Sequence, residues 1–218
     1  MSSYELRQRA WSKLTGNWGG PIAVSLIYAV ITGVLSAITQ NMPLASLLSI
    51  LVTAPLAIGL NKYFIQFSRS LSPDVEVLFD GFKESFVSSI LLSLLTALFV
   101  FLWTLLFIIP GIIKAFAYAM APYILAENPS VGITEALDQS QEMMKGHKMD
   151  LFILGLSFIG WVLLGLITLG IAFIWVAPYI SAASAEFYLE VSGGNIVHSV
   201  DETEKPAEED TFDSFLLK

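Results

Sequence analysis

Two proline–tyrosine pairs are the residues of this sequence whose type and position come closest to a site. Pro122-Tyr123 lies in AMAPYILAENPS and Pro178-Tyr179 in VAPYISAASAEF, and both segments otherwise read as apolar helix. A proline removes one helical hydrogen bond and can kink the helix, so a freed carbonyl needs another partner. The neighbouring tyrosine hydroxyl could serve that carbonyl or a ligand. We prefer a packing kink filled by the tyrosine to a cavity at mid-membrane.

Two further residues complete this candidate set of kink or pocket residues. Pro55 follows an alanine, like the other two prolines, in APLAIG. Lys114 stands a few residues inside the fourth apolar segment, near the preceding turn, and we expect its long stem to let the ammonium reach outward from lipid. Contact with an ion or a lipid headgroup is the functional alternative for Lys114.

The sequence is poor in the groups that catalysis and metal binding require. It contains no cysteine, which excludes disulfides, thiolate metal sites and a cysteine nucleophile. Its histidines are His147 and His198, and no carboxylates cluster inside the apolar segments. We therefore expect no catalytic, metal-binding or cofactor-binding residue, no cofactor and no enzymatic activity, and no nucleic acid among the partners.

The composition indicates a membrane protein built from helices. Of 218 residues, 55% are hydrophobic and 14% are charged, and the mean hydropathy is +0.70. Soluble domains carry about 25% charged residues, so a soluble bundle would have too little polar surface to cover itself. A helix needs about 20 apolar residues to cross a bilayer. Six such stretches predict an all-α protein with about six spans, at 22–39, 44–66, 86–108, 112–126, 151–168 and 171–189.

Equal spacing of three glycines predicts an internal repeat. Gly16, Gly81 and Gly146 are separated by 65 residues each, and each follows a short polar stretch and precedes an apolar one. We expect three hairpins of spans, at about 1–68, 69–127 and 128–190, each preceded by a short amphipathic interfacial helix. Each glycine should end its helix in the left-handed conformation. The alternative is shared ancestry without surviving symmetry.

Helical patterns support all three of these interfacial helices, and in the second stretch Ser72 is the expected cap and Pro73 the first helical residue. In the first stretch Leu6, Ala10 and Leu14 share one face. In the third, Asn128 is the expected cap and Pro129 the first helical residue.

The distribution of charge predicts the orientation in the membrane. The N-terminal segment and the second and fourth connections carry Lys and Arg, whereas QNMP, IPG and TLG in the other connections carry no charge. The positive-inside rule therefore places both termini in the cytoplasm. At that side three carboxylates, which could pair with Lys62, Lys83 or Lys148, are expected to be interfacial charges in water: Glu127, Glu186 and Glu190.

The last residues differ from the rest of the chain. Residues 191–218 hold seven acidic residues against two lysines, so we expect a domain at 1–190 and a disordered, solvated, acidic cytoplasmic tail at 191–218. A tail that binds a partner is the alternative.

Several blocks of the sequence resemble a bacterial integral-membrane family catalogued as Domain of unknown function 975. They are ELRQRAWSKLTGNW, LFDGFKESF, FLWTLLFIIPGIIKAFAYAMAPYILAENPS, ALDQSQEMMKGHKMDLFILGLSFIGWVLLGLITLGI and WVAPYISAASAEFY. The resemblance covers about residues 4–190 and implies a multi-pass protein of the bacterial plasma membrane, without a catalytic residue to carry over. The kinked hairpins also look distantly like the membrane domain of some glycerophosphodiester phosphodiesterases.

The function expected from these features is non-enzymatic. We expect a membrane protein that interacts with lipids or with a membrane-protein partner, in a scaffold, stress or immunity-type role. A small transporter or permease with a site between the kinked helices is the alternative, and an enzyme at the membrane surface ranks third. If Tyr123, Tyr179 and Lys114 line a hydrated cavity, transport gains support; if they pack against neighbouring side chains, it loses support.

Overall fold

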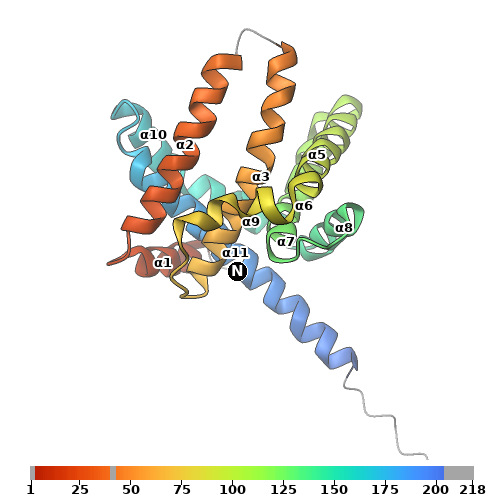
Figure 1. Cartoon of the computed structure of the whole chain (residues 1–218). Helices are drawn as coiled ribbons and strands as arrows, with labels where there is room; N and C mark the ends of the chain where they lie inside the picture. Colours follow the sequence, from red (N-terminus) through yellow and green to blue (C-terminus); the bar gives the residue numbers. More distant parts are fainter. Residues whose placement is uncertain (1–2, 40–42, 204–218) are drawn as a thin grey trace, which may run out of the picture.

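The fold is all-helical, as predicted. The computed structural model describes residues 3–39 and 43–203, and every regular element in these ranges is a helix (Figure 1). The elements are α1 (Ser3–Leu14), α2 (Gly19–Thr39), α3 (Pro43–Ser68), η1 (Val75–Phe79), α4 (Asp80–Glu84), α5 (Phe86–Leu106), α6 (Ile108–Tyr118), α7 (Ala121–Glu127), α8 (Ile133–Met143), α9 (Lys148–Ser157), α10 (Ile159–Ile167) and α11 (Phe173–Thr203).

Five helical segments in the described ranges are long and apolar enough to cross a membrane, which makes this a membrane protein. They are Gly19–Thr39, Ser49–Ser68, Phe86–Leu106, Ile108–Glu127 and Lys148–Ile167. The fourth joins α6 to α7, and the fifth joins α9 to α10.

The expected count of about six spans is not confirmed, because α11 is not among these segments. This helix carries Glu186 and Glu190, and a row of its residues is buried against other helices, including Ala182, Ala183 and Phe187. A helix that neighbouring helices shield from lipid can carry polar residues, because they face the protein interior.

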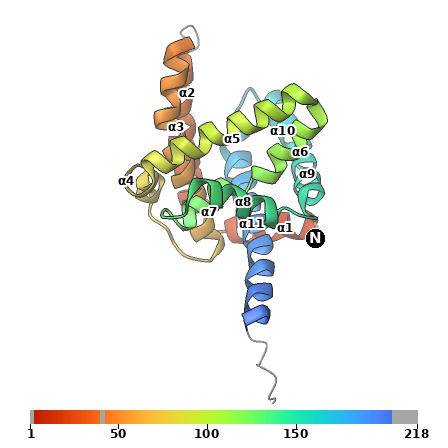
Figure 2. The same ribbon diagram turned by 90° about the vertical axis from the view of Figure 1, so that its right-hand side faces the viewer.

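Several helices pair with the next helix along the chain, and α1, α4 and α8 gather at one end of the bundle. Contacts join α2 to α3, α5 to α6 and α10 to α11. The helices α1, α4 and α8 lie across the end from which α11 projects, opposite the tip of the α2–α3 pair (Figures 1 and 2). We call this the charged end, because the ion pairs of Arg9, Lys13, Lys62 and Arg69 lie there. That the three pairs are copies of one unit stays a prediction.

The equally spaced glycines do not share one role. Gly16 and Gly146 have φ angles of 92° and 81°, so each adopts the left-handed conformation expected after α1 and α8. Gly81 instead lies within α4, and a Cβ there would stand 2.0 Å from the carbonyl oxygen of Pro55. Its glycine is needed for the close approach of α4 to α3, and the expectation of a left-handed helix end is wrong at this position.

The helix α1 buries its predicted face, but the helices of the second and third stretches begin later than expected, at Val75 and Ile133. In α1, Leu6, Ala10 and Leu14 are buried, as predicted. The helix α8 starts at Ile133, because residues 128–130 form a local turn: the Asn128 Oδ1 accepts hydrogen bonds from the Ser130 N–H (3.2 Å) and hydroxyl (2.6 Å).

Helix α11 ends at Thr203, whereas the predicted tail begins at residue 191. Residues 204–218 lie outside the described residues, so the disorder expected there stays a prediction.

Candidate functional site

The two candidate tyrosines pack against neighbouring aromatic rings. Tyr123 of α7 stacks on Tyr188 of α11, with ring centroids 5.3 Å apart. Tyr179 is buried, and its ring lies 5.5 Å from that of Trp11 and 5.1 Å from that of Phe158. Its hydroxyl donates to the Arg7 carbonyl at 3.3 Å, which ties α11 to α1 instead of serving a carbonyl freed by Pro178.

The three prolines occupy two kinds of helical position. Pro55 and Pro178 lie inside α3 and α11, and both helices continue through them. Pro122 stands in the first turn of α7, where a proline is tolerated because its N–H would have no helical partner. The break in the helix lies between Tyr118, the last residue of α6, and Ala121, the first residue of α7, so it comes before Pro122.

Lys114 points to α8 and not to the turn before α6. Its Nζ donates to the Gln141 Oε1 at 2.7 Å and lies 5.4 Å from the ring centre of Trp103 and 5.6 Å from that of Tyr118. An amide oxygen and two aromatic faces satisfy this half-buried ammonium. The structure therefore differs from the expectation that Lys114 reaches outward from lipid.

Two ion pairs fasten α1 to α11 at the charged end. The Glu186 carboxylate accepts from the Lys13 Nζ at 2.5 Å, and the Lys13 Nζ also donates to the Ser68 carbonyl. Glu190 pairs with Arg9 at 2.7 Å. The Glu186 side chain is only 6% exposed, so this carboxylate is a buried charge and not the water-exposed one that the sequence predicted.

The third carboxylate belongs to a separate cluster. Glu127 accepts the Tyr188 hydroxyl at 2.5 Å and pairs with Arg69. The alternative in which these three carboxylates pair with Lys62, Lys83 or Lys148 is wrong, because their partners are Arg9, Lys13 and Arg69. Lys62 pairs instead with Asp80 and Glu84, at 2.9 and 2.6 Å.

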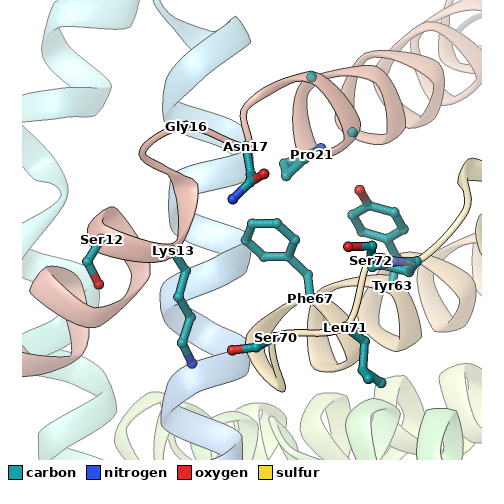
Figure 3. A pocket seen from close by; sticks show the side chains of 13 residues that line it. Ser12, Lys13, Gly16, Asn17, Pro21, Tyr63, Phe67, Ser70, Leu71 and Ser72 are labelled. Carbon is teal, nitrogen blue, oxygen red and sulfur yellow. The ribbon is translucent and has the colours of Figure 1, made fainter.

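A polar cleft of about 500 Å³ opens at the charged end. It lies between the α1–α2 connection and the end of α3 with the segment that follows (Figure 3). We call it the polar cleft, and its lining residues are Ser12, Lys13, Gly16, Asn17, Gly19, Gly20, Pro21, Tyr63, Phe67, Ser70, Leu71, Ser72 and Pro73.

The polar cleft lies where two spans end. Gly19, Gly20 and Pro21 begin the first span, and Tyr63 and Phe67 lie in the last two turns of the second. Membrane spans end at the level of the lipid headgroups. The cleft therefore lies at the level where these two candidate spans end.

Sequence reasoning missed this cleft. The signal that could have found it is the run TGNWGGP at residues 15–21, where small and polar residues surround the start of an apolar helix. No sequence signal marks Tyr63, because its position beside Gly20 depends on how α3 packs on α2.

A second, apolar pocket has a volume of about 260 Å³. Four tryptophans and a tyrosine line it, drawn from α1, the α1–α2 connection, α10 and α11. We call it the aromatic pocket, and its residues are Trp11, Trp18, Trp161, Leu164, Ala172, Trp175, Val176 and Tyr179.

Comparison with known proteins gives one family match. The family model described as "Protein of unknown function (DUF975)" matches residues 1–116 and 107–195. No curated protein matches the chain, and no solved structure does. The more distant likeness to the membrane domain of glycerophosphodiester phosphodiesterases stays a prediction.

Proposed function

The chain belongs to the DUF975 family of proteins of unknown function, and we propose that it is a non-enzymatic, multi-pass protein of the bacterial plasma membrane that binds membrane lipids. The observation that carries this proposal is the polar cleft at the ends of two spans. A lipid held there would have its headgroup in the cleft and its chains beside the spans.

The tryptophans near this level support the proposal. Trp11 and Trp18 line the aromatic pocket, and their neighbours in the sequence, Ser12 and Asn17, line the polar cleft. Tryptophan is enriched where a membrane protein meets the headgroup region, because its ring is apolar and its N–H is polar. Lipid chains and aromatic rings are both apolar, so the aromatic pocket suits part of a lipid. A membrane-protein partner with an apolar surface is a second possible occupant.

Transport is the weaker alternative. A transporter with a midplane site needs a polar path between its broken helices. The candidate residues for such a path are engaged elsewhere: Tyr123 stacks on Tyr188, Tyr179 bonds the Arg7 carbonyl, and Lys114 bonds Gln141.

Lipid retention tests the proposed function. We expect the protein, purified in a mild detergent and analysed by native mass spectrometry, to keep about one phospholipid per chain, because a cleft at headgroup level shields the bound headgroup from detergent exchange. A lipid-free protein that moves solutes across liposome membranes would contradict the proposal and favour transport.

Cysteine labelling tests the orientation. The chain contains no cysteine, so a single introduced cysteine reports its own position. We expect Leu169→Cys, at a site 94% exposed in the α10–α11 connection, to react with a membrane-impermeant maleimide in intact cells. Ser130→Cys, before α8, should react only after permeabilisation, because the positive-inside rule places that side in the cytoplasm. The reverse pattern would overturn the orientation.

A further inference from the structure

We propose that the polar cleft binds the phosphate group of a membrane phospholipid, between the first N–H groups of α2 and the hydroxyl of Tyr63. This inference rests on the proposed function and names the chemical group that the cleft recognises. It starts from two features that meet in the cleft among the residues that the structure describes: backbone N–H groups without an acceptor at the start of α2, and the Tyr63 hydroxyl, which makes no hydrogen bond.

The start of α2 offers free backbone donors. The Ile22 N–H bonds the Trp18 carbonyl at 3.0 Å, and Pro21 has no N–H. The N–H groups of Gly19 and Gly20 have no acceptor among the residues that the structure describes. Free N–H groups and the helix dipole together favour an anion at this position.

Tyr63 supplies the second donor. The residue is only 1% exposed, and its ring packs on Phe64 and Phe67, with centroids 5.4 and 6.5 Å away. Within the described part of the chain its hydroxyl makes no hydrogen bond, and it points toward the start of α2 (Figure 3). The hydroxyl lines the cleft, so it is free to donate a hydrogen bond to a ligand oxygen there.

Gly20 is what lets these two features meet. A Cβ at position 20 would stand 2.4 Å from the Tyr63 hydroxyl oxygen. Any residue with a side chain would therefore push the hydroxyl away from the helix start. The glycine thus lets a side-chain donor lie against the first turn of α2, whose free N–H groups are the other donors available to a phosphate.

The charges around the cleft favour a phosphodiester. Lys13 lines the cleft, but its ammonium is already paired with Glu186 at 2.5 Å. The cleft therefore attracts an anion mainly through the partial positive charge of the helix start. This weak charge suits a phosphodiester, with one negative charge, better than a phosphate group with two. Hydroxyl and amide groups of Ser12, Asn17, Ser70 and Ser72 remain for the polar part of a headgroup.

The test compares two tyrosine variants of the full chain. Tyr63→Phe removes only the hydroxyl, and Tyr28→Phe, on α2 but outside the lining of the polar cleft, is the matched control. We expect Tyr63→Phe to bind phosphatidylglycerol about tenfold more weakly, as the loss of a hydrogen bond to a charged group predicts. Tyr28→Phe should bind like the unaltered protein. Binding is measured by native mass spectrometry after titration with the lipid.

Two further probes identify the group and its source. Diacylglycerol, which lacks phosphate, should bind the unaltered protein and Tyr63→Phe equally weakly. Inorganic phosphate that displaces phosphatidylglycerol would support the site and show that it accepts free phosphate, and a failure to displace would support a site selective for the lipid phosphodiester.

Opposite results separate this inference from the proposed function. If the unaltered protein binds phosphatidylglycerol and Tyr63→Phe binds it equally well, the inference fails while lipid binding stands. If the unaltered protein binds diacylglycerol as tightly as phosphatidylglycerol, phosphate recognition also fails. If it binds neither lipid, the proposed function fails with it.

A second pair of variants tests the inference independently, in case Tyr63→Phe fails to fold. Gly20→Ala should displace the hydroxyl and weaken phosphatidylglycerol binding by a similar factor. Gly33→Ala, on the same helix with no atom within 4 Å of its added Cβ, should not. Equal binding by these two variants would overturn the inference.

Discussion

Replacing Lys13 with alanine lowers the free energy of unfolding by about 3 kcal/mol, the expected cost of leaving a buried charge without its partner. The Glu186 side chain is 6% exposed and accepts from the Lys13 Nζ at 2.5 Å. Without Lys13 this carboxylate keeps its desolvation cost and loses the attraction that offsets it. The contact between α1 and α11 should loosen, and thermal unfolding in detergent followed by circular dichroism measures the loss.

Two controls show whether the buried carboxylate is the cause. The double variant Lys13→Met with Glu186→Met should recover most of the lost stability, because neither buried position then holds a charge. Lys145→Ala breaks an exposed pair with Glu142 and should change stability by less than about 0.5 kcal/mol. If Lys13→Ala costs no more than Lys145→Ala, the ion pair does not hold α1 to α11.

Gly59→Ala should destabilise the protein by a similar amount, about 3 kcal/mol. An added Cβ at Gly59 would stand 1.9 Å from the Leu78 carbonyl oxygen. Backbone atoms cannot move aside like the end of a flexible side chain, so η1 must separate from α3. Gly81→Ala should act in the same way, because its Cβ would stand 2.0 Å from the Pro55 carbonyl oxygen. Thermal unfolding measures both variants.

The control for these variants is a glycine in open space. Gly155 lies inside α9, and its added Cβ would meet no atom within 4 Å. Gly155→Ala should leave stability unchanged or raise it by up to about 1 kcal/mol, because alanine is the better helix former. If Gly59→Ala and Gly81→Ala behave like Gly155→Ala, then α3 does not approach η1 and α4 as closely as described.

Features that depend on neighbouring residues could be read from the sequence alone. The apolar stretches indicated an all-helical membrane protein, and the face of Leu6, Ala10 and Leu14 identified α1. Gly16 and Gly146 end helices in the left-handed conformation, as expected. Each of these follows from the transfer of a local segment into lipid or from the conformation of a few adjacent residues, and such free energies need no knowledge of distant contacts.

Features that depend on which helices meet required the three-dimensional arrangement. Gly81 has the spacing of a helix-ending glycine but serves a close contact with Pro55. Lys114 was expected to reach outward from lipid, whereas its ammonium bonds Gln141, 27 residues away in the chain. The identity of a contact partner depends on how helices pack, and composition and spacing carry little information about that.

The polar cleft shows most clearly which features the sequence reveals and which depend on helix packing. The small residues before α2 are visible in the sequence as TGNWGGP, but they do not reveal what faces them. Packing of α3 on α2 brings the Tyr63 hydroxyl to Gly20, about forty residues along the chain, and forms the cleft between them. Local composition thus specified an all-helical membrane protein and the helix ends at Gly16 and Gly146, whereas the candidate site arose from contacts between residues far apart in the chain.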